Sequence, residues 1–309
     1  MANSRFFFSK AFSIQKSPYP ANTLSLPAMS VYTKFAIIGA GGVGSVVVDE
    51  LLKKGGAVSV AILTRDESKS ELQAFKARGA TLHQVAYDDV SAVTKALSGS
   101  EVVISTVAAY NIDVQKLIIP AAKAAGIHLF VPAEYGVTVT EGPNVVKKEV
   151  QDLLTQHEIP FTIFYTGLFS EYVPAFFGLN VEEGVMTVVG KGENPFSITP
   201  RTDVGRFVAH VVSTASKTEL CGAKIPFEAG RLSPMQIRDL VEKKYKKTIE
   251  VRHVDFEENK KKMATDFVAF LTTIFEEGRG VAGTEEEVKE SVAKFFPDWH
   301  PTTFESSLA

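Results

Sequence analysis

Four glycines near residue 40 have the spacing of a phosphate-binding turn. Gly39, Gly41 and Gly44 follow a short apolar run at residues 34–38 and open a helical pattern at residues 43–54. Glycine permits the tight turn at the first position, lets the backbone approach a pyrophosphate at the second, and allows close helix–strand packing at the third. The amino-terminus of a helix also presents free N–H groups to phosphates. An ordinary turn would use glycines too, but the strand–turn–helix context favours a dinucleotide site made by Gly39, Gly41, Gly42, Val43 and Gly44.

The residues after the second predicted strand select between the two nicotinamide dinucleotides. Enzymes that use NAD usually place a carboxylate here, where it accepts a hydrogen bond from the ribose 2′-hydroxyl. This sequence has the neutral Thr64 followed by Arg65, whose guanidinium can form charge-assisted hydrogen bonds to a 2′-phosphate. A small shift would let Asp66 meet the ribose instead, so NAD(H) stays open as the alternative. We predict NADP(H) as the preferred cofactor.

A repeating order of strands and helices positions these residues. Near-continuous hydrophobic strands that alternate with helices indicate a parallel sheet covered on both faces. The predicted strands lie at residues 34–38, 58–63, 81–85, 102–106, 128–131 and 161–165. The predicted helices between them lie at residues 43–54, 68–78, 89–98, 111–125 and 144–157. We therefore predict an α/β fold, a Rossmann-type doubly wound parallel sheet, whose dinucleotide-binding domain covers residues 30–167.

The regular alternation stops after Gly167. Residues 168–180 are rich in aromatic side chains. Short strands are predicted at residues 185–190 and 225–228, and helices at residues 204–214 (capped by Asp203), 233–246, 256–276 and 284–295. We predict a smaller α+β substrate lobe over residues 168–309, which partly returns to the main sheet near residues 200–228.

The composition narrows the possible partners. The chain has 309 residues and a formal net charge of -3, which argues against a nucleic-acid or anionic-membrane surface. Its single cysteine, Cys221, excludes an intramolecular disulfide, and the six histidines are too scattered for a zinc site. No apolar run reaches the ~18 residues that span a bilayer. We expect a small-molecule substrate and no metal, nucleic acid or membrane, and the oligomeric state stays open.

Residues 1–29 differ in composition from the rest of the chain. They contain no Asp or Glu, carry Arg5, Lys10 and Lys16, and include several serines and three consecutive phenylalanines. This composition is typical of a mitochondrial transit peptide. We favour a disordered extension, or a working start at Met29 shortly before the first strand, and therefore a cytoplasmic protein. A mitochondrial location is the alternative.

Several motifs together carry a resemblance to a known family. The glycine turn, the Thr64-Arg65 pair, the strand end Ser105-Thr106 and the Phe-Val-Pro-Ala-Glu-Tyr-Gly sequence at residues 130–136 resemble the isoflavone reductase-like, NmrA-like family. These are atypical short-chain dehydrogenase/reductases, and residues 296–299 resemble fungal members. The resemblance implies a Rossmann-type domain, NADP(H), and hydride transfer to a small aromatic, enone or carbonyl substrate. It also implies that Ser105, Thr106, Pro132 and Glu134 contribute to the cofactor site.

The resemblance further implies that Lys147 is catalytic. Reductases of this family use a lysine on the helix after residues 130–136, about a dozen residues before the strand that begins at residues 159–162. The helical pattern supports this choice, because Val146, Val150, Leu153 and Leu154 mark a buried stripe and Lys147 lies at its edge. Lys148 lies on a solvated face. Desolvation would lower the pKa of Lys147, which suits a proton donor, whereas the alternative is a surface lysine that only packs its stem.

Three departures from the plant reductases concern the substrate. Ala133 replaces a serine, Gly167 stands where asparagine is common, and the loop from Gly136 to Lys147 is shorter. They argue against a specific plant substrate. None of the eight tyrosines has a lysine four positions later, which disfavours the ordinary short-chain dehydrogenases. Tyr135 and Tyr165 are alternative proton donors, although we favour packing roles for both.

The aromatic run after Gly167 is the predicted substrate wall. Ligands of such folds bind beyond the carboxyl ends of the strands, where Phe169, Tyr172 and Phe176 follow the sixth strand directly. The same spacing is typical of a buried helix face, so core packing is an equal alternative. We predict an NADP(H)-dependent oxidoreductase. The rival function is a non-catalytic redox sensor or transcriptional co-regulator of the NmrA type, in which dinucleotide occupancy changes the affinity for a protein partner.

Overall fold

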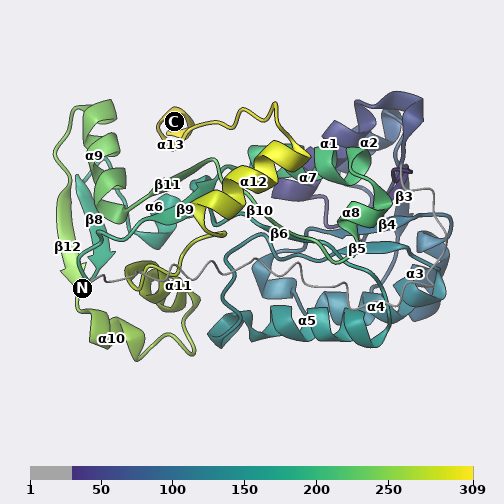
Figure 1. Cartoon of the computed structure of the whole chain (residues 1–309), viewed down its shortest axis with the longest axis horizontal. Coiled ribbons are helices and arrows are strands. Elements are labelled where there is room, and N and C mark those ends of the chain that lie inside the picture. Colours follow the sequence, from purple (N-terminus) through teal and green to yellow (C-terminus); the bar gives the residue numbers. More distant parts are fainter. Residues whose placement is uncertain (1–29, 309) are drawn as a thin grey trace, which may run out of the picture.

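A parallel sheet forms the centre of the molecule. The structure, a computed structural model, describes residues 30–308, so the expectations for residues 1–29 lie outside the described residues. The central strands are β1 (Lys34–Ile38), β2 (Ser59–Thr64), β3 (Thr81–Gln84), β4 (Val102–Ser105) and β5 (Leu129–Val131). They pair in the order β3-β2-β1-β4-β5, and every pairing is parallel. Figure 1 labels β3, β4 and β5 at the right of the molecule. This arrangement confirms the predicted Rossmann-type α/β fold.

Helices cover both faces of this sheet. One face carries α1 (Gly42–Leu52), α2 (Ser70–Ala77) and α7 (Arg201–Thr214), and the other carries α3 (Val90–Leu97), α4 (Val114–Ala124) and α5 (Val145–Gln156). Successive residues of β1 alternate between the two layers, as a strand requires. Phe35 and Ile37 pack with α1 and α7, whereas Ala36 and Ile38 pack with α3, α4 and α5. The turn that follows β1 is therefore fixed between two hydrophobic cores.

Two further strands extend the sheet beyond β5. Phe130 forms a parallel bridge with Phe161, and β6 (Ile163–Tyr165) pairs in parallel with β10 (Lys224–Pro226). Because β10 follows α7 and α8 (Lys217–Leu220) in the sequence, a strand from the second half of the chain lies beside one from the first half. The division into domains at residue 167 stays a prediction.

The remaining strands form a smaller lobe. Here β9 (Phe196–Thr199) lies between β7 (Leu168–Phe169) and β11 (Gly230–Leu232), and β8 (Val185–Val189) pairs with β12 (Glu250–Val254). Phe177, Phe196 and Phe275 stack in its core. The later helices are α6 (Val173–Phe176), α9 (Pro234–Tyr245), α10 (Phe256–Lys260), α11 (Phe267–Glu276), α12 (Glu285–Phe295) and α13 (Phe304–Ser307). Within residues 30–308, none of the helices has the length and apolar character to cross a membrane.

The single helix predicted over residues 256–276 is wrong, because the structure has two helices there, α10 and α11. Asp266 precedes α11, and its carboxylate accepts hydrogen bonds from the N–H groups of Val268 and Ala269 at 2.8 and 3.0 Å. This side chain satisfies the free donors of a new helix start. The apolar periodicity of the segment does not reveal that break.

The predicted cap of α7 is also wrong. The helix begins at Arg201, and Asp203 lies fully buried within its first turn. The Asp203 carboxylate accepts hydrogen bonds from Arg206 and from the backbone N–H of Thr302, each at 2.9 Å. It therefore ties α7 to the carboxyl-terminal segment, which is a tertiary contact that local sequence does not indicate.

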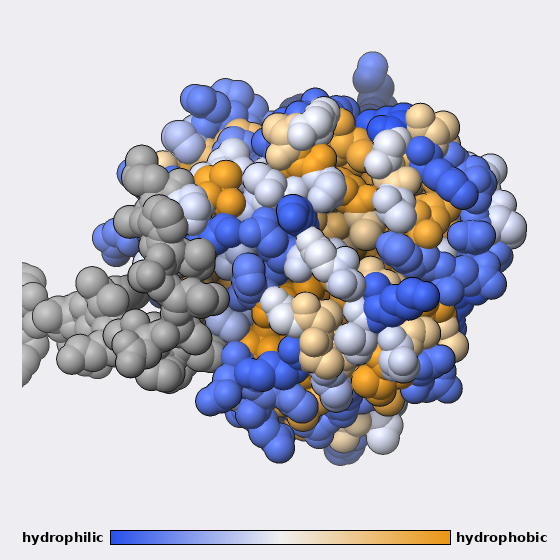
Figure 2. All heavy atoms as spheres, turned by 90° about the vertical axis from the view of Figure 1, so that its right-hand side faces the viewer, coloured by the Kyte–Doolittle hydropathy of each residue, from blue (hydrophilic) through white to orange (hydrophobic). Residues whose placement is uncertain are grey.

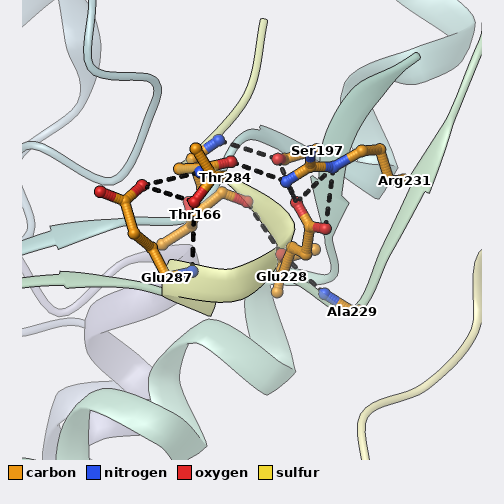
Figure 3. A network of polar contacts seen from close by, with 10 residues as sticks. Thr166, Ser197, Glu228, Ala229, Arg231, Thr284 and Glu287 are labelled. Carbon is orange, nitrogen blue, oxygen red and sulfur yellow. Dashed lines mark hydrogen bonds and ion pairs between the residues drawn. The ribbon is translucent and has the colours of Figure 1, made fainter. Parts of the chain in front are cut away.

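A partly buried polar network joins β9 to the segment after α11 (Figure 3). Ser197 of β9 donates a hydrogen bond to the carboxylate of Glu228 and accepts one from the N–H of Ala282 at 2.8 Å. Arg231 pairs with Glu228 through Nε at 3.0 Å and donates to the carbonyl of Gly283 at 2.8 Å. Charges with little exposure to water need such pairing, and Glu228 and Arg231 are each largely shielded. The network fixes β9. The strand β7, which follows β6 in the chain, pairs with β9.

Candidate active site

The glycine turn after β1 has the conformation and the space predicted for it. Gly39 has φ +88°, a conformation that side chains rarely adopt. A Cβ at Gly44 would overlap the carbonyl oxygen of Gly39, so the close packing predicted at this position is confirmed. A Cβ at Gly41 would have no described atom within 4 Å. The turn therefore leaves an open approach to its backbone at the amino-terminus of α1, where a phosphate would fit.

The end of β4 supports this turn from the neighbouring strand. Thr106 donates a hydrogen bond from Oγ1 to the carbonyl oxygen of Gly39. The Ser105 side chain is fully buried, and its Oγ has no hydrogen-bond partner among residues 30–308. A buried hydroxyl without a partner costs free energy, so Ser105 fits a site that supplies a polar partner. Thr106 thus shapes the turn, and beside it Ser105 carries a buried hydroxyl without a partner among the described residues.

Arg65 lies at the carboxyl end of β2, beside an open pocket of about 540 Å³. Tyr87 and Leu117 also line this pocket. Hydrophobic and hydrophilic residues are interspersed over the face of the molecule that Figure 2 shows. Within the described part of the chain Arg65 has no carboxylate partner. Asp66 instead accepts hydrogen bonds from the Ser68 N–H and hydroxyl at 2.9 and 2.6 Å, which lower the pKa of Asp66. Arg65 is therefore the charged side chain at the end of β2 that a ligand could contact.

The chain after β5 makes a tight and partly strained turn. Pro132 is buried, and its carbonyl accepts a hydrogen bond from the N–H of Glu134 at 2.8 Å. The N–H of Ala133 donates to the side chain of Gln115 at 2.8 Å. Tyr135 then has φ +31°, in the left-handed region that favours glycine. This conformation turns the Glu134 carbonyl toward α5.

Lys147 on α5 meets that carbonyl. Its side chain is 11% exposed, and Nζ donates a hydrogen bond to the Glu134 carbonyl oxygen at 2.6 Å. Nζ also lies 3.9 Å from the Glu134 carboxylate. Burial lowers the pKa of Lys147, and the Glu134 carboxylate opposes this by raising it. A buried lysine with a lowered pKa can give up its proton more readily than a surface lysine, which is the property of a general acid.

The helix orients its two adjacent lysines differently, as the sequence predicts. Lys148 is 54% exposed in its side chain and pairs with Asp152, one turn further along the same face. Val150 and Leu154 are buried with Lys147. Val146 and Leu153 are only half-buried, so Lys147 lies within the buried face rather than at its edge. The desolvation of Lys147 is therefore greater than the sequence pattern indicates.

The two alternative tyrosines are poorer proton donors. Burial raises the pKa of Tyr135, and its hydroxyl has no hydrogen-bond partner in residues 30–308. Burial and the Glu134 carboxylate raise the pKa of Tyr165 to about 12. A phenol with a raised pKa holds its proton more tightly at neutral pH. Both side chains pack in hydrophobic clusters.

The structure separates the three aromatic residues of the predicted substrate wall. Phe169 and Tyr172 pack against each other with ring centroids 5.8 Å apart, and Tyr172 is 43% exposed. Phe176 packs instead against Phe267 of α11. Phe177 lies in the core of the lobe. Phe169 and Tyr172 thus form the part of the aromatic segment nearest to β6, and in this pair the ring of Tyr172 stays exposed.

Arg201 and Glu171 lie at this site although the sequence analysis did not select them. The Arg201 guanidinium reaches the glycine turn, since a Cβ at Gly42 would lie 2.8 Å from its Nη1. Glu171 pairs with Arg201 Nε at 3.3 Å. No motif marks either residue, because they come from segments far from the turn in the sequence and only the packing of α7 on α1 brings them there.

Comparisons with known proteins identify the family of this chain. A model of the NmrA-like family matches residues 32–308. The chain belongs to the NmrA-like family. The resemblance inferred from the sequence motifs is thereby confirmed.

Two curated relatives illustrate the range of this family. Over 198 residues the chain is 32% identical to oxidoreductase aprR of Aspergillus flavus, an alignment that covers 60% of this chain and 65% of that protein. The chain therefore spans just under two thirds of that relative. It is also 28% identical over 277 residues to phenylcoumaran benzylic ether reductase PT1 of Pinus taeda, which covers 80% of this chain and 86% of the relative.

Solved structures of NmrA-like fold superimpose over most of the chain. The leucoanthocyanidin reductase–NADPH complex of Vitis vinifera has a TM-score of 0.74 at 21% identity, with 88% of this chain and 97% of that chain covered. The quinone oxidoreductase of Escherichia coli complexed with NADPH has a TM-score of 0.67 at 22% identity, with 88% and 97% covered. At these identities the likeness establishes the shared fold.

Proposed function

We propose that this chain is an NADP(H)-dependent oxidoreductase that reduces a small aromatic, enone or carbonyl compound, with Lys147 as proton donor. The observation that carries the proposal is the buried Lys147 ammonium, held at 2.6 Å by the Glu134 carbonyl beyond the end of β5. Burying a lysine costs free energy, and ionisable groups with perturbed pKa values cluster at functional sites. Its place at the carboxyl edge of the sheet, where ligands of such folds bind, supports a catalytic purpose.

The residues at the carboxyl edge of β1, β2 and β4 fit a dinucleotide with a 2′-phosphate. Gly39, Gly41 and Gly44 would admit the pyrophosphate, together with the backbone of Gly42 and Val43. Arg65 would bind the 2′-phosphate, because Asp66 is already occupied by Ser68. The buried Ser105 hydroxyl would form a hydrogen bond with the ribose. Thr106 would hold the turn, and Pro132 and Glu134 would shape the adjoining wall.

The reaction needs a hydride and a proton at the substrate. When bound, the reduced nicotinamide supplies the hydride. Lys147 then donates a proton from Nζ to the substrate oxygen or carbanion that the reduction makes basic, and Glu134 orients the ammonium through its carbonyl. Phe169 and Tyr172 provide an apolar wall for a planar substrate. Relatives named as a phenylcoumaran benzylic ether reductase and as quinone oxidoreductase 2 support an aromatic substrate class.

The test is direct binding followed by turnover. Titration of NADPH and NADH gives the cofactor preference, and oxidation of NADPH is then followed with a panel of quinones, enones and phenolic ethers. We expect tight NADPH binding and turnover with at least one member of the panel. Failure to bind NADPH would contradict the proposal. Tight binding without any turnover would favour the alternative, a redox sensor of the NmrA type.

We also propose a cytoplasmic location and a folded protein that needs none of residues 1–29. The support for the dispensable segment is that, within residues 30–308, the first strand starts at Lys34 and every proposed cofactor residue follows it. A protein beginning at Met29 should fold and bind NADPH as well as the full chain. Import of a full-length fusion into mitochondria would contradict the location.

A further inference from the structure

Arg201 lies where two helix amino-termini meet. α1 begins at Gly42 and α7 begins at Arg201. The two helices pack closely side by side, because a Cβ at Gly42 would meet the Arg201 side chain at 2.8 Å and a Cβ at Gly205 would meet Val46 at 2.5 Å. From the first contact to the second, the position moves four residues forward on both helices, from 42 to 46 on α1 and from 201 to 205 on α7. The helices therefore run parallel and start together. Their amino-termini therefore direct partial positive charge to one place.

The guanidinium of Arg201 adds a full positive charge at this place. Its Nη1 faces Gly42, at the start of α1. A cation is unfavourable beside a helix amino-terminus, since the helix dipole has the same sign there. An anion of more than one charge would stabilise all three groups at once. Arginine is also the side chain best suited to phosphate oxygens, because its planar fork makes two parallel hydrogen bonds.

Glu171 is the carboxylate that neutralises part of this charge. Its oxygens accept hydrogen bonds from the Arg201 backbone N–H at 3.1 and 3.3 Å, and Oε1 lies 3.3 Å from Arg201 Nε. The neighbouring Tyr172 places its ring 5.6 Å from the centre of the same guanidinium. Glu171 and Tyr172 belong to the aromatic segment proposed to wall the substrate. Arg201 is thus in contact with the phosphate turn on one side and with the substrate segment on the other.

We propose that Arg201 is a ligand of the dinucleotide pyrophosphate and that Glu171 competes with the pyrophosphate for it. This inference rests on the proposed function. Phosphate binding draws the guanidinium from Glu171 toward the glycine turn, and the ring of Tyr172 loses or shifts its contact. Cofactor binding is thereby coupled to the segment that contacts substrate. If Glu171 competes with the pyrophosphate, loss of Glu171 tightens dinucleotide binding. Loss of a purely structural ion pair would not tighten it.

The test compares two ligands that differ in the pyrophosphate. NADPH carries it, whereas adenosine 2′-monophosphate carries only the 2′-phosphate. Arg201→Gln should weaken NADPH binding about 10-fold or more, the range for a hydrogen bond to a charged group, and leave adenosine 2′-monophosphate unchanged. Glu171→Gln keeps an acceptor for the backbone N–H of Arg201 but removes the charge, and should tighten NADPH binding several-fold. Arg65→Gln is the matched control, since it should weaken both ligands.

The outcomes separate this inference from the proposed function. If wild type binds NADPH and Arg65→Gln weakens it, but Arg201→Gln binds like wild type, the role of Arg201 is wrong and the proposed function stands. If Glu171→Gln weakens NADPH binding, the pair is structural and the competition is wrong. If wild type does not bind NADPH, both proposals are wrong. Arg201→Lys, which keeps the charge, should show an intermediate loss, and the thermal midpoint of each variant checks that it folds.

Discussion

Lys147 donates a 2.6 Å hydrogen bond to the backbone carbonyl of Glu134 while the carboxylate of the same residue stays 3.9 Å away. The carboxylate is itself held by the side chain of Gln151, which donates to Oε1 at 2.7 Å. The backbone carbonyl of Glu134 therefore orients the Lys147 ammonium, whereas the Glu134 carboxylate only modulates its pKa. This arrangement holds the Lys147 Nζ at the Glu134 carbonyl, just after the carboxyl end of β5.

Removal of the Lys147 ammonium should slow the chemical step without weakening the binding of NADPH. Lys147→Ala is expected to lower kcat by about 10²–10⁴-fold, the usual contribution of a positioned proton donor. The dissociation constant for NADPH should stay unchanged, because the phosphates are bound elsewhere. Lys148→Ala is the control, since that lysine is exposed and pairs with Asp152. Lys147→Arg should not restore turnover, because guanidinium holds its proton too tightly. Normal turnover by Lys147→Ala would exclude the lysine and make Tyr165 the next candidate.

The pH profile should move when the Glu134 charge is removed. Burial lowers the pKa of Lys147 and the Glu134 carboxylate raises it, so Glu134→Gln leaves desolvation unopposed and lowers that pKa further. Lysine donates a proton only while it is protonated, so kcat falls as pH rises through its pKa. The alkaline limb of kcat against pH should therefore shift to lower pH in Glu134→Gln. Asp152→Asn, which removes an exposed carboxylate from the same helix, should leave the profile in place. A shift to higher pH would contradict the assignment.

Arg65 should determine the preference between the two dinucleotides. Arg65→Ala is expected to weaken NADPH binding about 10–100-fold, because a hydrogen bond to a charged group contributes about 1.5–3 kcal/mol. NADH binding should not change, since NADH lacks the 2′-phosphate. Arg78→Ala is a suitable control, as Arg78 is an exposed arginine that pairs with Asp49. Equal affinity of the wild type for NADPH and NADH would contradict the prediction.

Two glycines of the turn should respond differently to a methyl group. At Gly44 a Cβ overlaps the carbonyl of Gly39, so Gly44→Ala should destabilise the protein by about 1–3 kcal/mol, as overpacking does. At Gly41 the space is open, so Gly41→Ala should leave the thermal midpoint unchanged and weaken NADPH binding. Thermal denaturation and cofactor titration of the two variants separate the effects. Unchanged NADPH affinity in Gly41→Ala would mean that no phosphate approaches this backbone.

Gly167 should not accept the asparagine that is common in the plant reductases. Its φ of +73° is one that asparagine tolerates, but a Cβ there overlaps the carbonyl of Ser197 on β9. Gly167→Asn is therefore expected to lower the thermal midpoint, because β9 is fixed by the network around Glu228 and cannot easily retreat. Gly222→Asn is the matched control, with φ +76° and no described atom within 4 Å. Equal stability of the two variants would show that β9 yields at this point.

Local patterns in the sequence were sufficient for the first half of the fold. Strand and helix periods follow from which side chains face water, and they predicted the five strands of the central sheet and the helices between them. The glycine turn was predictable as well, because a tight strand-to-helix turn demands glycine whatever surrounds it. The face of Lys147 on its helix also followed from periodicity, since Val150 and Leu154 lie one and two turns further on.

The tertiary structure alone decided how distant segments complete the site. The helical pattern across residues 256–276 continues through a break that Asp266 caps, and the sequence of α7 does not reveal that Asp203 binds the backbone of Thr302. Arg201 reaches Gly42 because α7 packs against α1, and Lys147 meets the Glu134 carbonyl at a turn where Tyr135 adopts a left-handed conformation. Such contacts depend on which apolar faces bury each other across the whole chain. A local pattern records that a face is apolar, and only the packed structure determines its partner.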